Sequence, residues 1–279
     1  MSDKSILYVT SFAQDMYQMT GQKLINTFLK FQTESDQRLL ICYENFDYQP
    51  PLVISKSGVT KVDNRILCYN LSHSQYLQQW LSNNQDIIPD YLGGKATKVK
   101  KPKIFNSYWN RKASRWFRKI AALEYALRTY GAQYHYLVWL DSDVQLISTL
   151  PTSVIKKQFL DKTNKTEVGA FCHFGQFRRK KDTGIESGVI GFQLDYGGYP
   201  LLQRVIKVFQ DGSFRKYPRW DDGYIFRMVM LDHNPKPYKY MVRDLIQQST
   251  NSTEVISVGP LKKYLSHKKG THARKKIIK

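Results

Sequence analysis

The sequence predicts an α/β fold with a mostly parallel central sheet flanked by helices. Short apolar runs typical of strands alternate along the chain with segments of helical periodicity, which is the pattern of parallel α/β proteins. With 42% hydrophobic and 24% charged residues over 279 positions, the chain can bury a large core and form a single domain. The runs that predict strands are Ile6–Val9, Arg38–Tyr43, Arg65–Tyr69 and Tyr136–Leu140.

The chain opens with the apolar strand, continues as a polar loop with aromatic residues at 10–19, and then forms a helix from Thr20. A strand, a loop and a helix in this order begin many nucleotide-binding α/β domains. We therefore expect ligands to bind at the carboxyl ends of the strands. The buried face of the helix is predicted by four apolar residues at helical spacing, Leu24, Ile25, Phe28 and Leu29.

A second helix leads into the strand that is expected to be central. Tyr136–Leu140 is apolar on both faces, as the inner strands of a parallel sheet are, and it runs directly into Asp141-Ser142-Asp143. Gly131 is a typical helix stop before it. The helix itself is predicted by apolar residues that recur at spacings of four and three, namely Trp116, Ile120, Leu123, Leu127 and Tyr130.

The charge of the chain calls for an acidic partner. Lys and Arg number 43 against 23 Asp and Glu, a net charge of +20, and residues 91–123 hold ten basic and no acidic side chains. Nucleic acid, a phosphorylated small molecule and an anionic membrane all remain open as that partner. No apolar run approaches the roughly 18 residues of a membrane span, and the N-terminus lacks the pattern of a signal peptide. We expect a cytoplasmic protein, with peripheral membrane contact left open.

The cysteines exclude two kinds of site. Cys42, Cys68 and Cys172 stand in apolar contexts with no CxxC or CxxH pair, so neither a zinc knuckle nor a disulfide framework is indicated. Buried thiols are the expectation.

Asp141 and Asp143 are the first candidate ligands. Two carboxylates directly after a buried strand lie where α/β sheets bind ligands, and they repel each other unless a cation lies between them. Oxygen ligands of this kind favour Mg²⁺ or Mn²⁺ shared with phosphate oxygens. The alternative is a turn in which each Asp bonds its own backbone.

The helix before this strand is antiparallel to it, so its N-terminal half should lie beside the diacid. Rises of about 3.3 Å per strand residue and 1.5 Å per helix residue place the level of Asp141 near position 117. Arg115, Arg118 and Lys119 are therefore candidates to bind a diphosphate. On a helical wheel Lys119 flanks the buried face and Arg115 lies further round. Arg118 points almost opposite, where a solvated role is equally open.

Further acidic residues fall in two segments. The segment 184–192 places Glu186 in a glycine-rich turn before an apolar strand, and a solvated Glu in a plain turn is the alternative. Asp221 and Asp222 follow Trp220 at the start of an amphipathic helix, where an Asp is often only a cap. A catalytic carboxylate is the other interpretation for Asp222.

The C-terminal segment His267-Lys268-Lys269-Gly270 combines a metal ligand, two cations and a glycine, which distinguishes it from the remaining basic tail.

With these motifs in this order, the sequence resembles the nucleotide-sugar-dependent glycosyltransferases of the GT-A fold, which is Rossmann-like. The likeness covers nearly the whole chain and rests on order and spacing. It also resembles, more distantly, the small signal-less glycosyltransferases of large algal viruses, xylosyltransferases among them, which act in the host cytoplasm. The residues that carry it are Leu7–Phe12, Val138–Asp143, Glu186-Ser187-Gly188, Trp220-Asp221-Asp222 and His267–Gly270.

The resemblance implies a metal centre and a donor site. Asp143 would ligate Mn²⁺ or Mg²⁺, Asp141 would lie near the metal or the ribose, and His267 would complete the metal shell. Ala273 stands where the family has a Lys, so Lys268, Lys269 or Arg274 would have to supply the pyrophosphate cation. Some members of the family have a basic residue on the helix before the diacid, and this residue corresponds to Arg118. The correspondence conflicts with the helical wheel, on which Arg118 points away from the buried face. The nucleoside, a uridine, would contact Thr10, Ser11, Phe12 and Tyr17, with Ser142 beside the diphosphate.

The resemblance also implies the chemistry. Asp222 would be the reactive carboxylate, and Asp221 is the second candidate. This carboxylate would deprotonate the acceptor hydroxyl in an inverting enzyme or lie beneath the donor sugar in a retaining one. An inverting reaction is marginally favoured. Glu186 would position the donor sugar or the acceptor. Residues 1–145 would bind the nucleotide and 146–279 the acceptor, an oligosaccharide or glycoconjugate.

Two other functions compete with a UDP-sugar transferase. The charge of +20 is also typical of a protein that binds nucleic acid or another polyanion, although a diacid at the edge of a sheet argues against a nucleic-acid partner. A two-metal nucleotidyltransferase or nuclease would need a further acid near the first pair, which Asp221 or Asp222 could supply.

Overall fold

The structure is a computed structural model, and it describes residues 6–54, 60–87, 112–159, 173–177, 185–195, 197–232, 242–244 and 259–267. Lys268, Lys269, Arg274 and Cys172 lie outside these ranges, as does most of the basic segment 91–123. Within the described ranges, no helix has both the length and the hydrophobicity needed to cross a bilayer.

A seven-stranded sheet forms the centre of the fold, in the order β10-β8-β9-β6-β1-β2-β5. Only β9 runs antiparallel to its neighbours β6 and β8, while the other paired strands of this sheet are parallel. The predicted α/β class with a mostly parallel sheet is therefore confirmed. The strands are β1 (Ile6–Ala13), β2 (Gln37–Glu44), β5 (Ile66–Asn70), β6 (Tyr136–Leu140), β8 (His173–Phe177), β9 (Ile185–Gln193) and β10 (Val242–Asp244).

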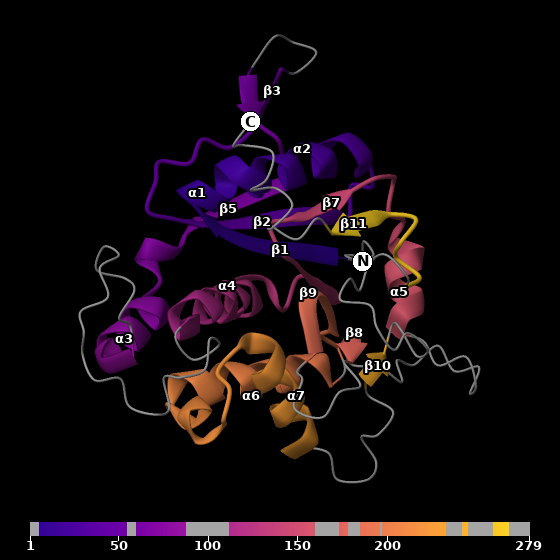
Figure 1. Cartoon of the computed structure of the whole chain (residues 1–279). Coiled ribbons are helices and arrows are strands. Elements are labelled where there is room, and N and C mark those ends of the chain that lie inside the picture. The colour runs from indigo at the N-terminus through magenta and orange to yellow at the C-terminus, as the bar shows by residue number, and fades with distance from the viewer. Residues whose placement is uncertain are drawn as a thin grey trace, which may run out of the picture.

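Helices cover both faces of this sheet (Figure 1). One face packs against α2 (Gln22–Phe31) and α5 (Thr152–Phe159), and the other against α3 (Gln75–Asn83), α4 (Ala113–Tyr130), α6 (Gly198–Gln210) and α7 (Asp222–Asp232). Each layer has its own apolar core. Phe28 is fully buried in the first and Phe117 in the second. Two small antiparallel ribbons complete the fold, β3 (Leu52–Ile54) with β4 (Thr60–Val62) and β7 (Val144–Leu146) with β11 (Leu265–His267).

The strand order reverses between β1 and β6. From β1 the chain proceeds outward through β2 and β5, and it returns to the other side of β1 as β6. A crevice forms at such a reversal, outside the carboxyl ends of the two strands, and it is the usual ligand site of open α/β sheets. The Asp141–Asp143 segment follows β6 at this edge.

Two expected loops are strands. β1 continues through Thr10, Ser11 and Phe12 to Ala13, because all eight of its residues pair with β2, from Ile6 with Gln37 to Ala13 with Glu44. The helical part then begins at Gln14, as α1 (Gln14–Met16) and a π-helical turn (Tyr17–Gly21), rather than at Thr20. Glu186-Ser187-Gly188 belongs to β9 rather than to a turn, since ladder pairing to β8 and β6 overrides the local preference of glycine.

The helix expectations hold with small shifts. Leu24, Ile25 and Phe28 are buried, and in α4 Ile120, Leu123 and Leu127 are buried while Trp116 is only partly covered. Phe117 takes the central position instead, stacking on Trp80 with ring centroids 4.1 Å apart. The expectation of buried thiols is correct for Cys42 and wrong for Cys68, which faces outward from the edge strand β5.

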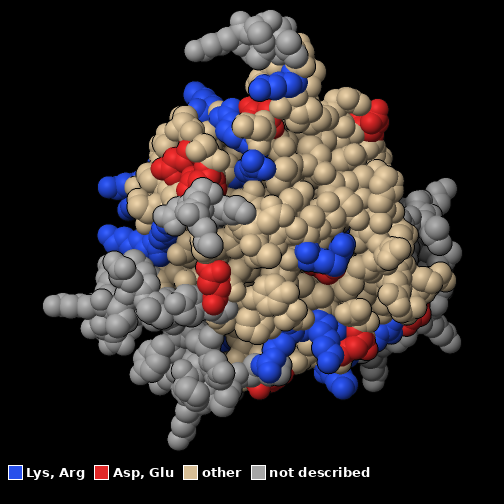
Figure 2. All heavy atoms as spheres, turned by 180° about the vertical axis from the view of Figure 1, so that it is seen from behind, with Lys and Arg blue, Asp and Glu red and all other residues tan. Residues whose placement is uncertain are grey.

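Charged side chains are interspersed on the face shown in Figure 2. Lys and Arg lie among Asp and Glu around a broad area of other residues, and the described part of this face has no continuous basic surface. The described part of this face therefore lacks the continuous basic surface that is typical of nucleic-acid-binding proteins.

Candidate active site

A tight turn holds Asp141 at the end of β6. Its backbone N–H donates to the carbonyl of Gly188 (2.8 Å), and its own carbonyl accepts the N–H of Val144 (2.9 Å). Its carboxylate is bound by other side chains, since Oδ1 accepts from the indole Nε1 of Trp139 at 2.6 Å and pairs with Lys119 Nζ at 2.9 Å. Burial opposes ionisation of this carboxyl, but Lys119 and His267 outweigh it and lower the pKa of Asp141. Asp141 is thus held as a carboxylate at the sheet edge.

The β7–β11 ribbon brings His267 to the diacid. β11 pairs antiparallel with β7 so that His267 lies opposite Val144, and its Nε2 is 2.9 Å from Oδ1 of Asp143. Burial opposes protonation of this imidazole, but the hydrogen bond and charge of Asp143 raise the pKa of His267. The expected approach of His267 to Asp143 is therefore present, across 124 positions of sequence.

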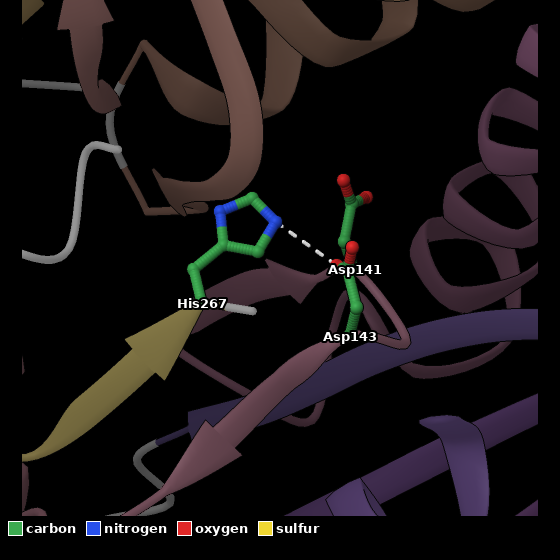
Figure 3. A group of neighbouring side chains, drawn as sticks. All are labelled: Asp141, Asp143 and His267. Carbon is green, nitrogen blue, oxygen red and sulfur yellow. Dashed lines mark hydrogen bonds and ion pairs between the residues drawn. The ribbon is translucent and has the colours of Figure 1, made fainter. Parts of the chain in front are cut away.

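Asp141, Asp143 and His267 form a group that could hold a metal ion. One ligand atom from each lies within 4.8 Å of the others, and Figure 3 shows the two carboxylates of the turn between β6 and β7 near the imidazole at the end of β11. Two carboxylates and one imidazole suit Mn²⁺ and, through the oxygens, Mg²⁺. The donor set therefore fits a divalent cation.

Gly188 leaves the space in which the His267 ring lies. A Cβ at position 188 would come within 2.8 Å of Cε1 and 3.2 Å of Nδ1 of His267. Any side chain at this position would displace the imidazole. The glycine of the Glu186-Ser187-Gly188 segment thus permits close approach, although to a side chain rather than to a ligand.

Among the described lysines and arginines, Lys119 is the one that pairs with the diacid. It lies two positions along the helix from position 117, which the rises of strand and helix place level with Asp141. It is 7% exposed, and its Nζ pairs with Asp141 at 2.9 Å and with Asp222 at 2.7 Å. It also donates to the carbonyl and hydroxyl of Ser187, at 2.9 and 3.1 Å. Burial opposes the charge, but the two carboxylates outweigh it and raise the pKa of Lys119. Protein groups already surround the ammonium that was expected to bind a diphosphate.

The two acids at the start of α7 have different environments. The Asp221 carboxylate accepts the N–H of Tyr224 at 3.2 Å and pairs with Arg219 at 2.9 Å, so the capping alternative describes this residue. Burial is the main cause that raises the pKa of Asp221. Asp222, 2% exposed, faces Lys119 and through it Asp141. Asp222 is therefore the acid of this segment that joins the site.

The other two cations of α4 that were expected to bind a diphosphate, Arg118 and Arg115, contact other residues. Arg118 donates from Nη2 to Oε1 of Glu44 at 3.0 Å and from Nε to the second carboxylate oxygen. The solvated role for Arg118 is thus wrong, because Glu44 at the end of β2 meets a helix face that the wheel assigns to water. Arg115 is exposed, with its guanidinium 5.8 Å from the ring centroid of Trp116.

The residues expected to contact a nucleoside lie at the carboxyl end of β1 and in the π-helical turn that follows it. Tyr17 stacks on Phe46 with centroids 5.5 Å apart and lies 5.5 Å from Phe12. Thr10 is buried and Ser11 is partly buried on β1. Thr20 Oγ1 lies 3.2 Å from Ser142 Oγ, which links the opening helix to the diacid turn.

Sequence patterns missed several members of the site. Glu44 and Thr20 carry no motif of their own, and Trp139 was predicted only as part of the strand before the diacid. The pairing of β2 with β1 and the π-helical turn Tyr17–Gly21 place Glu44 and Thr20. Glu186, which was predicted, is buried on β9 opposite Gln176 and contributes to the raised pKa of His267.

No protein-family model matches the chain, and no curated protein matches it. Among solved structures, apo mouse xyloside xylosyltransferase 1 is similar over 86% of this chain and 85% of that chain, with 10% identity and a TM-score of 0.46. A glycosyltransferase involved in the glycosylation of the major capsid of PBCV-1 is similar over 99% of this chain and 100% of that chain, with 11% identity and a TM-score of 0.46.

Proposed function

We propose that this chain is a divalent-metal-dependent glycosyltransferase that moves a sugar from a UDP-sugar to a hydroxyl of a glycan acceptor. The observation that carries the proposal is the convergence of Asp141, Asp143 and His267 at the carboxyl end of β6, where the strand order reverses between β1 and β6. A nucleoside diphosphate needs a cation at the edge where its phosphates bind, and this donor set supplies the ligands for one.

The residues around this group have distinct roles in the proposal. A divalent ion held by Asp143, Asp141 and His267 would stabilise the negative charge that develops on the leaving diphosphate. Asp222 accepts the proton of the acceptor hydroxyl, in an inverting reaction, because it is the further carboxylate tied into the site. Asp221 holds the start of α7, and Glu186 orients the donor sugar or the acceptor.

The donor side is assigned to the half of the chain that contains β1 and β6. Tyr17 and its aromatic neighbours hold the uracil, and Ser142 lies next to the diphosphate. The sugar is a xylose or another pentose or hexose. Residues 1–145 form the nucleotide-binding half and 146–279 the acceptor-binding half. Lys268, Lys269 or Arg274 supplies the cation for the pyrophosphate.

Calorimetric titration with UDP tests the donor site. We expect UDP to bind in the presence of Mn²⁺, to bind at least tenfold more weakly without it, and to lose the metal dependence in Asp143→Asn. Asp195→Asn is the matched control, because Asp195 is an exposed acid that pairs with His135 away from the diacid. Equal UDP binding with and without Mn²⁺ in the wild-type protein would refute a metal-borne diphosphate site.

The transfer itself is tested with a panel of UDP-sugars and simple glycan acceptors. The anomeric proton of the first-formed product, observed by NMR, reports the stereochemistry. Inversion supports Asp222 as the base, whereas retention assigns it to the face of the donor sugar. Release of no sugar from any member of the panel, under conditions in which UDP binds, would contradict the proposal.

A further inference from the structure

The ammonium of Lys119 lies in a cage of oxygen atoms that resembles a cation site. Four oxygens surround Nζ: Asp222 Oδ2 at 2.7 Å, Asp141 Oδ1 and the Ser187 carbonyl each at 2.9 Å, and Ser187 Oγ at 3.1 Å. Two of the four are carboxylates, and the Trp139 ring lies 4.9 Å from Nζ. The ammonium is thus held as a compact buried charge.

Asp141 is shared between this cage and the Asp141–Asp143–His267 group. In two-metal enzymes the ions lie about 3.5–4 Å apart and are held by neighbouring or shared carboxylates. Asp141 occupies the place of the shared carboxylate here, with Asp143 and His267 on one side of it and Asp222 on the other. The carboxylates that a two-metal site needs are therefore present. The ammonium of Lys119, however, contacts Asp141 and Asp222 where a second ion would lie.

We infer that Lys119 takes the place of a second metal ion, so that the site holds one divalent cation and Asp222 is not a metal ligand. Lys119 is then a positioning residue. It keeps the Asp222 carboxylate oriented and unligated, which a base for an acceptor hydroxyl requires, and it excludes the two-metal arrangement of a nucleotidyltransferase or nuclease. The inference rests on the proposed function only in taking the Asp141–Asp143–His267 group as the metal centre.

The stoichiometry of Mn²⁺ binding tests this inference without any activity measurement. Protein is dialysed against Mn²⁺, and free Mn²⁺ is measured by its electron paramagnetic resonance signal. We expect one Mn²⁺ per chain in the wild-type protein and two in Lys119→Ala, which empties the cage and leaves both carboxylates. The double variant Lys119→Ala with Asp222→Asn is the matched control, and we expect it to return to one.

The melting temperature provides a second measurement, because Lys119→Ala leaves two buried carboxylates without their partner and can fail to fold. We expect Mn²⁺ to raise its melting temperature more than that of the wild-type protein, or to restore its folding. Two Mn²⁺ in the wild-type protein overturn the inference directly. One Mn²⁺ in both proteins overturns the inference but leaves the metal centre intact, whereas no Mn²⁺ in the wild-type protein removes both.

Discussion

Adding one methyl group at Gly188 should weaken metal binding by displacing His267. The Cβ of Gly188→Ala would lie 2.8 Å from Cε1 of His267, whereas ordinary contacts begin at 3.4 Å, so the ring must move by about 0.6 Å. The side chain of His267 is only 3% exposed, which leaves it little room to turn aside. Metal–ligand distances tolerate only about 0.2 Å.

We therefore expect Gly188→Ala to bind Mn²⁺ about 10–100-fold more weakly, the loss typical when a ligand is misoriented, or about 1.4–2.8 kcal/mol. Equilibrium dialysis measures this change in Mn²⁺ affinity. Gly212→Ala is the matched control, because Gly212 has a φ of 76° and open space around it, so alanine there costs stability but does not touch the site. Unchanged Mn²⁺ affinity in Gly188→Ala, with the fold intact, would refute the reasoning.

Three further predictions concern catalysis, pH and a helix cap. Asp222→Asn should lower turnover about 10²–10⁴-fold while Mn²⁺-dependent UDP affinity stays within twofold, measured by initial rates and calorimetry. The hydrogen bond from Arg65 lowers the pKa of buried Asp63. Asp63→Asn should therefore cost about 1.5–3 kcal/mol of unfolding free energy at neutral pH, a difference that disappears as the pH falls below about 4 towards the depressed value. Ser74→Ala removes the cap that accepts the Leu77 N–H at 3.2 Å and should cost about 1 kcal/mol in urea unfolding.

Each of these has its own control. Asp195→Asn should leave turnover unchanged, and a similar fall there would mean that charge in general, not Asp222, sets the rate. For the pH series, a stability difference between wild type and Asp63→Asn that is already lost before the pH falls to about 4 would contradict the depressed pKa. The exposed Ser82 on the same helix gives the comparison for Ser74, and equal effects of Ser74→Ala and Ser82→Ala would show that capping contributes nothing.

Much of the fold follows from local sequence patterns. The apolar runs identify β1, β2, β5 and β6, and the apolar residues of α4 identify its buried face, because alternation and helical periodicity are properties of neighbouring residues. The rise of a strand and of a helix then placed Lys119 beside Asp141, since these rises do not depend on the rest of the fold. The extent of β1 was missed because the polar residues Thr10 and Ser11 interrupt its apolar run, whereas pairing to β2 continues to Ala13.

The composition and position of the diacid were determined by the sequence alone: two carboxylates after a strand buried on both faces. Only the tertiary structure decided which side chains contact these two carboxylates. The β7–β11 pairing brings His267 to Asp143, and the packing of α4 and α7 places Lys119 between Asp141 and Asp222. Arg118 likewise meets Glu44 through the register of β2. These partners are far apart in sequence, and local periodicity contains no information about which distant strands pair or which helix faces meet.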